Sequence, residues 1–289
     1  KHHYLSRPGG YYKFGYCSDS HLCSKYARED VLNDLYDWFA TEGVDRVFNT
    51  GNYIDGEARF NKHDIHTHGM QNQIDYFCKN YPKRTIIGTP PAGRPVSGKI
   101  PITQRPLITY IVSGDDHEGW YGQREGLDVG WLMEQTAREK FKRTDLINLG
   151  YMEAFIRLKH ADYSDIYSHL LAVHPGGGSA YATSYAPQKY VEALQGGEKP
   201  AGILCGHWHK VFDLIIRNII CLGGGCTKDL DTFGRKMKLQ YHLAGMIVEL
   251  WQDAKGAITR YRVEKKQYFD RGYYNDQWSY TGQPGKVAA

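Results

Sequence analysis

Apolar positions near the start of the chain follow the periods of a strand, a helix and a second strand. Residues 11–18 form a strand-like run, and apolar residues between 31 and 39 recur at the spacing of one helix face. Gly43 marks the end of that helix, and a second short apolar run covers 44–49. The pattern predicts a β-α-β unit with polar residues directly after each strand.

The rest of the chain predicts further helices and then a series of short strands. Helices are expected at 70–78, 130–142 and 187–194, and strands at 107–112, 166–173, 201–205, 211–216, 219–222, 243–251 and 257–263. Strands alternate with helices in the first part and dominate the last part. This order predicts an α/β fold, a sandwich of two mixed β-sheets flanked by helices.

Three segments fall outside this pattern and outline one domain over residues 11–265. Residues 1–10 resemble a linker or the N-terminal boundary of a longer protein, and residues 266–289 are expected to form a polar C-terminal tail. Residues 89–106 are rich in proline and glycine, which predicts a loop insertion within the domain.

The overall composition is that of a globular protein without a membrane partner. Of the 289 residues, 41% are hydrophobic and 24% are charged, and no apolar run approaches the roughly 20 residues that span a bilayer. The net charge of +4 allows an anionic partner without requiring one. The six cysteines contain no CxxC pair, which favours free thiols and a reducing, cytoplasmic location.

Polar residues able to bind metal follow five of the predicted strands. In chain order these stretches are Asp19-Ser20-His21, Gly51-Asn52-Tyr53-Ile54-Asp55, Gly114-Asp115-Asp116-His117-Glu118, Val173-His174-Pro175 and Gly206-His207-Trp208-His209. One histidine at a strand end is usually structural, but five such stretches are hard to explain by packing. Open α/β sheets place their sites at strand ends, and mixed imidazole and carboxylate ligands suit Mn, Fe, Zn or Ni rather than Ca.

The order and content of these stretches resemble the calcineurin-like metallophosphoesterases. That family carries DxH, GDxxD, GNH(D/E), a histidine and GHxH in this order. This chain has DSH, GNYID, DHE, a histidine before a glycine-rich turn, and GHWH. The resemblance covers about residues 11–250, and it implies a four-layer αββα sandwich with a dinuclear metal centre.

Carried over residue by residue, the resemblance implies two ligand sets. One metal would take Asp19, His21 and His209, the other would take Asp116, His174 and His207, and Asn52 falls at the bridging position between them. Manganese is the expected metal, with Fe, Zn or Ni as alternatives. Two such cations about 3.5–4 Å apart can hold a shared hydroxide and clamp a phosphate for in-line attack.

Three further residues are candidates for catalytic or supporting roles beside the metals. His117 matches the family histidine that assists the leaving group or contacts the phosphoryl oxygens. Glu118 could orient the His117 ring or keep it protonated, and an ordinary surface carboxylate is the alternative. Asp55 is better placed to support metal ligands than to bind a metal itself.

Two positions depart from the family pattern. The family has Asp at the bridge and Asn at the later position, whereas this chain has Asn52 and then Asp116, so the formal ligand charge is unchanged. The exchange is explained either by a compensated natural variant or by an engineered Asp→Asn substitution. A neutral bridging amide should hold the metals less tightly. Asp115 would replace Asp116 as the ligand if the turn were offset by one residue.

Aromatic and basic residues near the motifs suggest where a substrate could bind. Trp120, Tyr121, Arg124 and Trp208 are close in sequence to candidate ligands, and the tryptophans could stack on a base, with loop packing as the alternative. The first hypothesis is therefore a metal-dependent phosphodiesterase or nuclease that acts on nucleic acid or a nucleotide. The alternatives are a phosphomonoesterase or protein phosphatase, and a catalytically weakened module that binds metal and nucleic acid.

Overall fold

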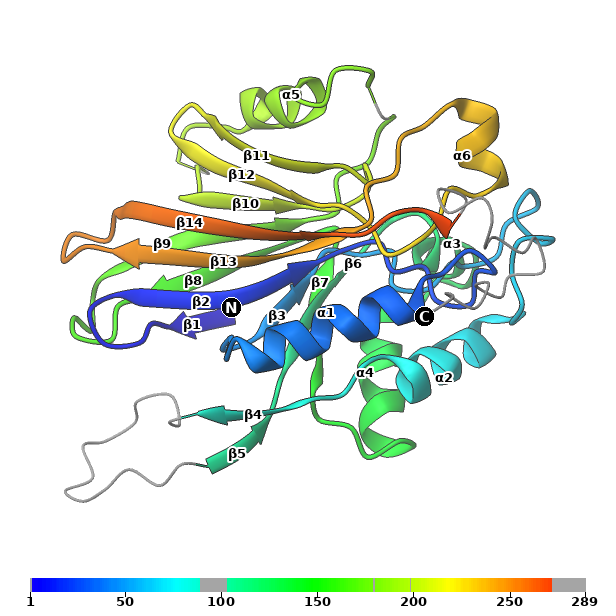
Figure 1. Cartoon of the computed structure of the whole chain (residues 1–289), viewed down its shortest axis with the longest axis horizontal. Helices are drawn as coiled ribbons and strands as arrows, with labels where there is room; N and C mark the ends of the chain where they lie inside the picture. Colours follow the sequence, from blue (N-terminus) through cyan, green and yellow to red (C-terminus); the bar gives the residue numbers. More distant parts are fainter. Residues whose placement is uncertain (1, 89–102, 179, 198, 272–289) are drawn as a thin grey trace, which may run out of the picture.

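The computed structural model contains two six-stranded β-sheets that pack face to face between helices (Figure 1). It describes residues 2–88, 103–178, 180–197 and 199–271. The helices are α1 (Glu29–Thr41), α2 (Met70–Asn80), α3 (Glu118–Glu125), α4 (Val129–Glu139), α5 (Tyr185–Ala193) and α6 (Thr232–Met237). Within these described ranges, no helix has the length and apolar character needed to cross a membrane.

The first sheet, called here the β2 sheet, has the strand order β14-β13-β2-β3-β6-β7. Its strands are β2 (Tyr11–Cys17), β3 (Val47–Asn49), β6 (Thr109–Ser113), β7 (Leu146–Tyr151), β13 (Ala244–Gln252) and β14 (Ile258–Gln267). Strands β2, β3, β6 and β7 run parallel, and β13 pairs antiparallel with both β2 and β14.

The second sheet, called here the β9 sheet, has the strand order β1-β8-β9-β10-β12-β11. Its strands are β1 (His2–Leu5), β8 (Glu153–Lys159), β9 (Tyr167–Val173), β10 (Gly202–Cys205), β11 (Val211–Ile216) and β12 (Ile219–Gly224). Strands β9, β10 and β12 run parallel, while β8 and β11 run antiparallel to β9 and β12. Both sheets are mixed, so the prediction of two mixed sheets is confirmed.

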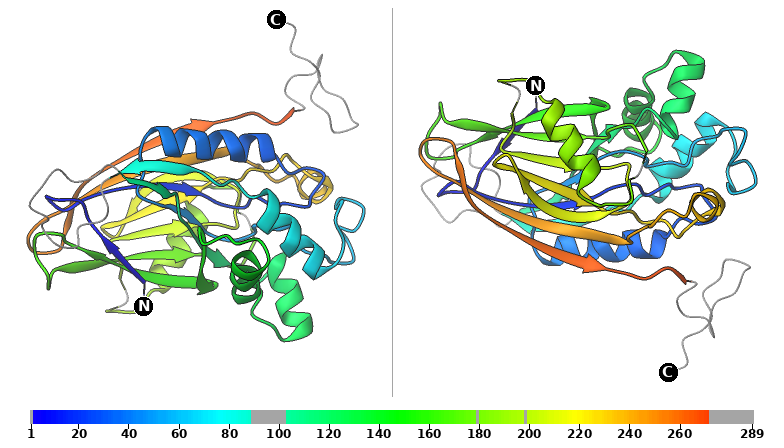
Figure 2. Two further views of the ribbon diagram at one scale, coloured as in Figure 1. Left: turned by 90° about the horizontal axis from the view of Figure 1, so that it is seen from below. Right: turned by 90° about the horizontal axis from the view of Figure 1, so that it is seen from above.

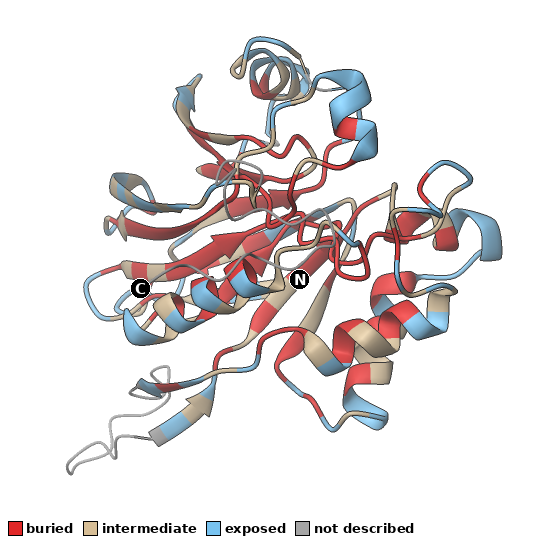
Figure 3. Ribbon diagram, turned by 45° about the vertical axis from the view of Figure 1, so that its right-hand side comes forward, coloured by how far each residue is buried: buried red, intermediate tan, exposed pale blue. Residues whose placement is uncertain are grey.

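Three apolar clusters hold four layers together. Helices α1, α2 and α4 cover the outer face of the β2 sheet, the two sheets enclose the middle cluster, and α5 covers the outer face of the β9 sheet (Figure 2). Helix α1 illustrates how a helix is held on its sheet. It buries Val31, Leu35 and Phe39 at four-residue spacing, and the burial of each such side chain stabilises the fold by roughly 1.5–3 kcal/mol. In Figure 3 the buried residues follow the strands and the inner faces of these helices. The four-layer αββα architecture implied by the sequence is thereby confirmed.

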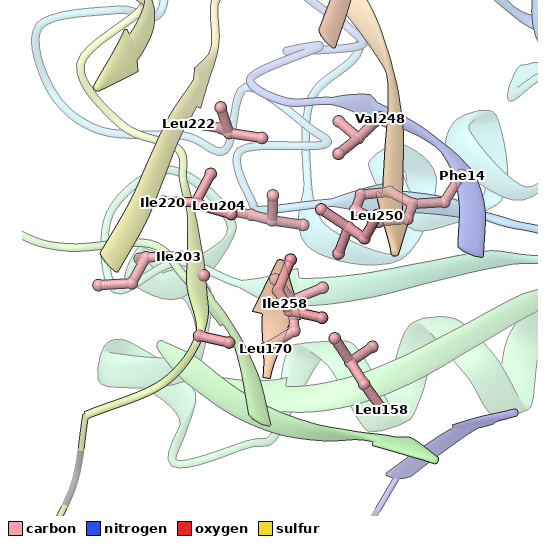
Figure 4. A pocket seen from close by; sticks show the side chains of 12 residues that line it. Phe14, Leu158, Leu170, Ile203, Leu204, Ile220, Leu222, Val248, Leu250 and Ile258 are labelled. Carbon is pink, nitrogen blue, oxygen red and sulfur yellow. The ribbon is translucent and has the colours of Figure 1, made fainter. Parts of the chain in front are cut away.

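A small apolar cavity lies within the core between the sheets (Figure 4). Its lining residues are all apolar and include Phe14, Leu204 and Leu250 from both sheets. The volume of about 10 Å³ is near the lower limit for one water molecule. A cavity of this size without polar groups is a packing defect and not a ligand site.

Residues 2–5 form a strand of the fold, whereas the sequence predicted a linker or an N-terminal boundary over residues 1–10. Strand β1 pairs in parallel with β8, and Tyr4 is buried with its hydroxyl donating to Asp45 at 2.9 Å. The short run His2–Leu5 has no apolar alternation of its own. Its pairing depends on a partner strand about 150 residues away in the sequence.

The proline-rich segment and the tail also differ from their predicted bounds. Residues 103–106 form β5 (Thr103–Pro106), which pairs antiparallel with β4 (Thr85–Gly88) in a separate two-stranded sheet. The rest of the predicted insertion, 89–102, lies outside the described residues. Strand β14 extends to Gln267, beyond the predicted domain end, and residues 272–289 of the predicted tail also lie outside the description.

Candidate metal centre

Five parallel strands deliver the candidate residues to one edge of the sandwich. Strands β2, β3 and β6 of one sheet, and β9 and β10 of the other, each end just before one of the polar stretches. The loops after them, with α3 and α6, lie on the right-hand side of Figure 1. This edge is where open α/β sheets place their functional sites.

Asp19, His21 and His209 form the first cluster, and all three are buried. His21 donates from Nδ1 to Asp55 Oδ1 at 2.9 Å, so its Nε2 carries the lone pair. This Nε2 lies 3.0 Å from His209 Nε2, which in turn lies 3.4 Å from Asp19 Oδ1. Two ring nitrogens and a carboxylate oxygen thus converge, and a cation would stabilise such a set.

Asp116, His174 and His207 form the second cluster. His174 donates from Nδ1 to the Thr50 carbonyl at 2.6 Å, and His207 donates from Nε2 to the Gly177 carbonyl at 2.6 Å. His174 Nε2 lies 3.1 Å from Asp116 Oδ1. His207 Nδ1 lies 3.2 Å from Asp116 Oδ2, but this contact lacks the geometry of a hydrogen bond. A metal-binding histidine is typically held in this way, by a carbonyl behind the ring.

The charges in the second cluster favour a cation. Burial lowers the pKa of His174, but its contact with Asp116 and the charge of Asp19 raise it to about 9. Burial alone would raise the pKa of Asp116, yet His174 and His207 hold it far below its usual range. The negative field that retains a proton on His174 would also attract a divalent ion in place of that proton.

Asn52 lies between the two clusters with an unpaired amide oxygen. Its carbonyl accepts the His21 N–H at 2.7 Å, and the Gly51 carbonyl accepts the Asp19 N–H at 3.0 Å. Gly51 also packs against the His174 ring, since an added Cβ would lie 2.4 Å from Nδ1. Asn52 Oδ1 is buried and has no hydrogen-bond partner among the described residues. Such an oxygen costs about 1–3 kcal/mol unless it is paired, so the donor set fits a bridged pair of metal ions.

The backbone at this edge is strained where the candidate residues lie. Six of them have a positive φ although none is glycine: Asp19 (51°), His21 (47°), Asn52 (49°), His117 (50°), His207 (73°) and His209 (53°). Each such residue costs on the order of 1 kcal/mol or more, and strain of this kind concentrates at functional sites. The sharp turns direct consecutive polar side chains towards one place.

Asp55 connects the first cluster to a buried lysine. Its Oδ1 accepts hydrogen bonds from His21 and from Lys228 Nζ, the latter at 2.8 Å. Lys228 is buried and also pairs with Asp231 at 2.7 Å. Burial lowers the pKa of Lys228, but these two carboxylates raise it above its usual value. Asp55 therefore contacts a candidate ligand, and its carboxylate also forms a further group of possible metal donors with His21 and His117.

His117 begins α3 beside the first cluster. Its Nδ1 donates to the Asp55 carbonyl at 2.8 Å, and its ring packs edge-on against His21 with centroids 4.3 Å apart. Burial lowers the pKa of His117, and the charges of Asp116 and Asp55 offset part of that shift. The ring is therefore next to the candidate metal ligands, with Nε2 as the nitrogen that remains for chemistry.

Glu118 has a different role from either one proposed from the sequence. It is fully buried, and its Oε1 accepts hydrogen bonds from the backbone N–H groups of Gly114 at 2.8 Å and Asn52 at 3.0 Å. Burial raises its pKa to about 8. The prediction that it orients the His117 ring is wrong, and so is the surface alternative. Glu118 instead ties together the loops that carry Asn52 and Asp116.

The offset between Asp115 and Asp116 is resolved by their placement, because Asp116 alone of the two joins a cluster of candidate ligands. Asp115 is partly exposed, and its carbonyl accepts a hydrogen bond from Gln123 at 2.6 Å. The Asp116 carboxylate instead contacts His174 and His207, so the two neighbouring aspartates have different surroundings.

The four predicted substrate contacts fall into different environments. Trp120 lies beside the site and stacks on His117 at 4.6 Å. Tyr121 is buried in the helical core, and Trp208 is buried in the core under α5, so neither can stack on a base. Arg124 is exposed but pairs with Glu125 on α3. For the residues on α3, closeness in sequence to the motif did not predict closeness to the site, because consecutive helical residues face different sides.

Comparison with known proteins gives matches among solved structures. No model of a protein family matches the sequence, and no curated protein matches it. An archaeal phosphodiesterase is 14% identical over 88% of this chain and 99% of that chain, with a TM-score of 0.38. A predicted phosphoesterase from Streptococcus pneumoniae is 12% identical over 89% and 98%, with a TM-score of 0.37.

Vps29 from Entamoeba histolytica, solved in complex with zinc, is 10% identical over 88% of this chain and 98% of that chain, with a TM-score of 0.33. These matches have low identities and TM-scores below 0.5. Identities this low concern the fold alone, so the metal centre is interpreted from its own residues.

Several residues at the site were not found from the sequence. Lys228 and Asp231 follow β12, at the same edge as the other polar stretches, so the strand-end rule could have located them. Lys228 carried no signal because lysine is not a metal ligand, and Asp231 lies outside the five polar stretches. The carbonyls of Thr50 and Gly177 carry no side-chain signal at all.

Proposed function

We propose that this chain is a dinuclear metal-dependent phosphoesterase, specifically a phosphodiesterase or nuclease that acts on nucleic acid or nucleotides. The observation that carries the proposal is the pair of His/Asp clusters, together with the buried, unpaired side-chain oxygen of Asn52 on a loop whose carbonyls contact His21 and His174. Manganese is the proposed metal because it accepts mixed imidazole and carboxylate donors, with Fe, Zn or Ni as alternatives. The six buried, free cysteines support a reducing, cytoplasmic setting for this activity.

The ligands are oriented in advance of metal binding, which supports a catalytic role. His21 is held by Asp55, and His174 and His207 are held by backbone carbonyls, so each ring presents one defined nitrogen. Two divalent ions bound in such clusters supply an activated water and polarise phosphoryl oxygens. The chain itself contributes their positions and a largely buried surrounding.

His117 is the proposed proton-transfer group. Its Nδ1 is engaged by the Asp55 carbonyl, so Nε2 exchanges a proton with the leaving oxygen. Its lowered pKa keeps the ring neutral near pH 7, and an approaching phosphoryl group would raise that pKa by its negative charge. The ring can then hold and deliver a proton when the ester bond breaks.

The amide at the bridge does not remove the charge that the site needs. Asp116 supplies a carboxylate to the second cluster, and Asn52 contributes a neutral oxygen between the two clusters. This arrangement favours a catalytically active metal centre with a weakened bridge, and it disfavours a module that only binds metal and nucleic acid.

The test is hydrolysis of two model substrates by protein loaded with Mn²⁺. We expect bis-p-nitrophenyl phosphate to be cleaved faster than p-nitrophenyl phosphate, and a chelator to abolish both activities. A preference for the monoester would replace this proposal with a phosphomonoesterase. No diester turnover with Mn, Fe, Zn or Ni, in this chain and in its Asn52→Asp variant, would refute it.

A further inference from the structure

Three aromatic rings lead from His117 to the surface. Trp120 stacks on His117, Phe60 packs edge-on against Trp120 with centroids 5.4 Å apart, and Phe233 lies 5.8 Å from Phe60. Phe60 is 61% exposed and Phe233 is 47% exposed. We call Phe60, Trp120 and Phe233 the aromatic platform. Contiguous exposed apolar surface beside a candidate active site indicates a binding function.

Two of the rings are held in a defined position relative to the metal centre. Asn61, next to Phe60, donates to both the carbonyl and the carboxylate of Asp55 at 3.3 and 3.2 Å. Trp120 stacks on His117, which donates to the same Asp55 carbonyl. Asp55 also orients a candidate metal ligand, so these rings and the metal centre share one anchor.

The third ring is tied to that anchor through α6. Asp231 caps the N-terminus of α6 by accepting the Gly234 N–H at 2.7 Å, and it pairs with Lys228. Lys228 in turn pairs with Asp55 at 2.8 Å. Phe233 lies between these contacts in sequence, so its backbone is fixed to the site although its ring is exposed.

Exposed cations adjoin the exposed rings. Arg59 and Lys236 are both exposed. Arg59 directly precedes Phe60, and Lys236 lies three residues after Phe233 on α6, a spacing that places both on the same face of the helix. Surfaces that bind single-stranded nucleic acid combine these two features, because the rings stack on bases and the cations neutralise phosphates. In a double strand the bases stack on one another, so their faces are not available to the rings. A purely apolar partner would make no contact that uses the positive charges.

We propose that the aromatic platform binds an unpaired nucleobase of a single-stranded nucleic acid, on the side of the metal centre where His117 lies. This inference rests on the proposed function, because it names the substrate class of the same site. Stacking on a ring face depends little on base identity, so the platform confers a preference for unpaired bases and not for a sequence.

The test compares two oligonucleotides of equal charge by fluorescence anisotropy, with a chelator present so that no cleavage occurs. One is an oligothymidylate of about ten nucleotides, and the other has the same length but lacks bases. We expect the oligothymidylate to bind roughly tenfold more tightly, and the Phe60→Leu/Phe233→Leu variant to lose that difference. Trp131→Leu is the matched control, because Trp131 is 58% exposed on α4 outside the platform and should leave the difference intact.

Equal affinity for the two oligonucleotides, or a difference that survives in the double variant, would overturn the inference. A dimer detected by light scattering and abolished by the same double variant would assign the platform to a second copy of the chain, and would also overturn it. Turnover of bis-p-nitrophenyl phosphate separates this failure from that of the proposed function. Turnover without base discrimination removes only the platform inference, and base discrimination without turnover removes only the phosphoesterase.

Discussion

The two candidate metal clusters contain the same kinds of ligand, but they differ in depth and in what supports them. The first is buried, with Asp19 and His21 inaccessible to solvent, and its support is ionic through Asp55 and Lys228. Charged groups buried this deeply are retained only when they are well paired.

The second cluster is more open and is held by neutral groups. The side chain of Asp116 is 25% exposed and that of His207 is 18% exposed. Backbone carbonyls hold its two histidines. The contrast suggests a firmly held ion in the first cluster and an exchangeable ion in the second, coupled weakly through the neutral Asn52.

The largest effect is expected from removing the charged ligand of the buried cluster. Asp19→Asn takes away the only carboxylate among Asp19, His21 and His209, so metal content and diester turnover should fall, turnover by about a thousandfold or more. Elemental analysis and initial rates measure both. Ser20→Ala, at the buried residue between two ligands, should retain its metal, and equal losses in both variants would contradict the assignment.

The second-largest effect is expected from removing the carboxylate of the second cluster, and it tests whether each cluster binds its own ion. Asp116→Asn should lower the metal content of the protein from two ions to one, because the first cluster keeps its ligands. Turnover should fall by about a hundredfold or more. Asp115→Asn is the matched control, since Asp115 lies outside the cluster, and a similar loss in this control would reverse the choice between the two aspartates.

Removing the buried cation of Lys228 should weaken metal binding by the first cluster, because Lys228 pairs with Asp55 and Asp55 holds His21. Lys228→Met leaves Asp55 and Asp231 buried without their shared partner, which should reduce the free energy of unfolding by about 3 kcal/mol. It should also weaken metal binding by about 10–100-fold. Lys140→Met breaks an exposed pair with Asp75 and should cost less than about 1 kcal/mol. Denaturant unfolding and metal titration distinguish the two variants.

A charged residue at position 52 should reduce the difference in metal affinity between the two clusters. Asn52→Asp replaces the unpaired amide oxygen with a carboxylate, and we expect the affinity for the second metal ion to rise by about tenfold. Isothermal titration of metal-free protein measures this change. Asn72→Asp adds the same charge at an exposed position of α2, outside both clusters. An equal gain in metal affinity in that variant would show a general effect of negative charge and would contradict a bridging role for residue 52.

The last expected effect is the pH dependence of stability in the metal-free protein, which acts gradually over several pH units. The pKa of Glu118 is raised to about 8 in the folded state, so folding favours its protonated form. The stabilisation is complete below the ordinary carboxyl pKa and is lost as pH rises towards 8, at up to about 1.4 kcal/mol per pH unit. Glu118→Gln keeps the acceptor oxygen and should flatten this slope in thermal unfolding from pH 5 to 8, and an unchanged slope would contradict the assignment.

Much of the fold could be predicted because its signals are local. The helix face of α1 and the strands β2, β9 and β10 appear as apolar periods in continuous stretches of sequence. Strands β1, β4, β5, β7 and β8 and helices α3 and α6 were not predicted. Strand β1 shows the reason, because its four residues owe their conformation to pairing with β8 and not to a pattern of their own.

The candidate ligands were also accessible to sequence reasoning, and their surroundings were not. Histidine and aspartate at successive strand ends form a rare combination that needs no contact information. Trp208 and Tyr121 looked equally suitable for binding a base, but both are buried in cores. Phe60 and Phe233 carried no signal, since only the packing of α6 on a distant loop brings them together.

The sequence by itself determined the order of most strands and helices and the set of candidate ligands, because periodicity and residue type are properties of short stretches. The tertiary structure alone decided which nitrogen of His21, His174 and His207 faces a neighbouring ligand, since a carbonyl or carboxylate from another segment occupies the other nitrogen of each ring. It also decided that Lys228 meets Asp55, which is 173 residues away in the chain. Such contacts depend on how the sheets and helices pack, and no local pattern encodes that packing.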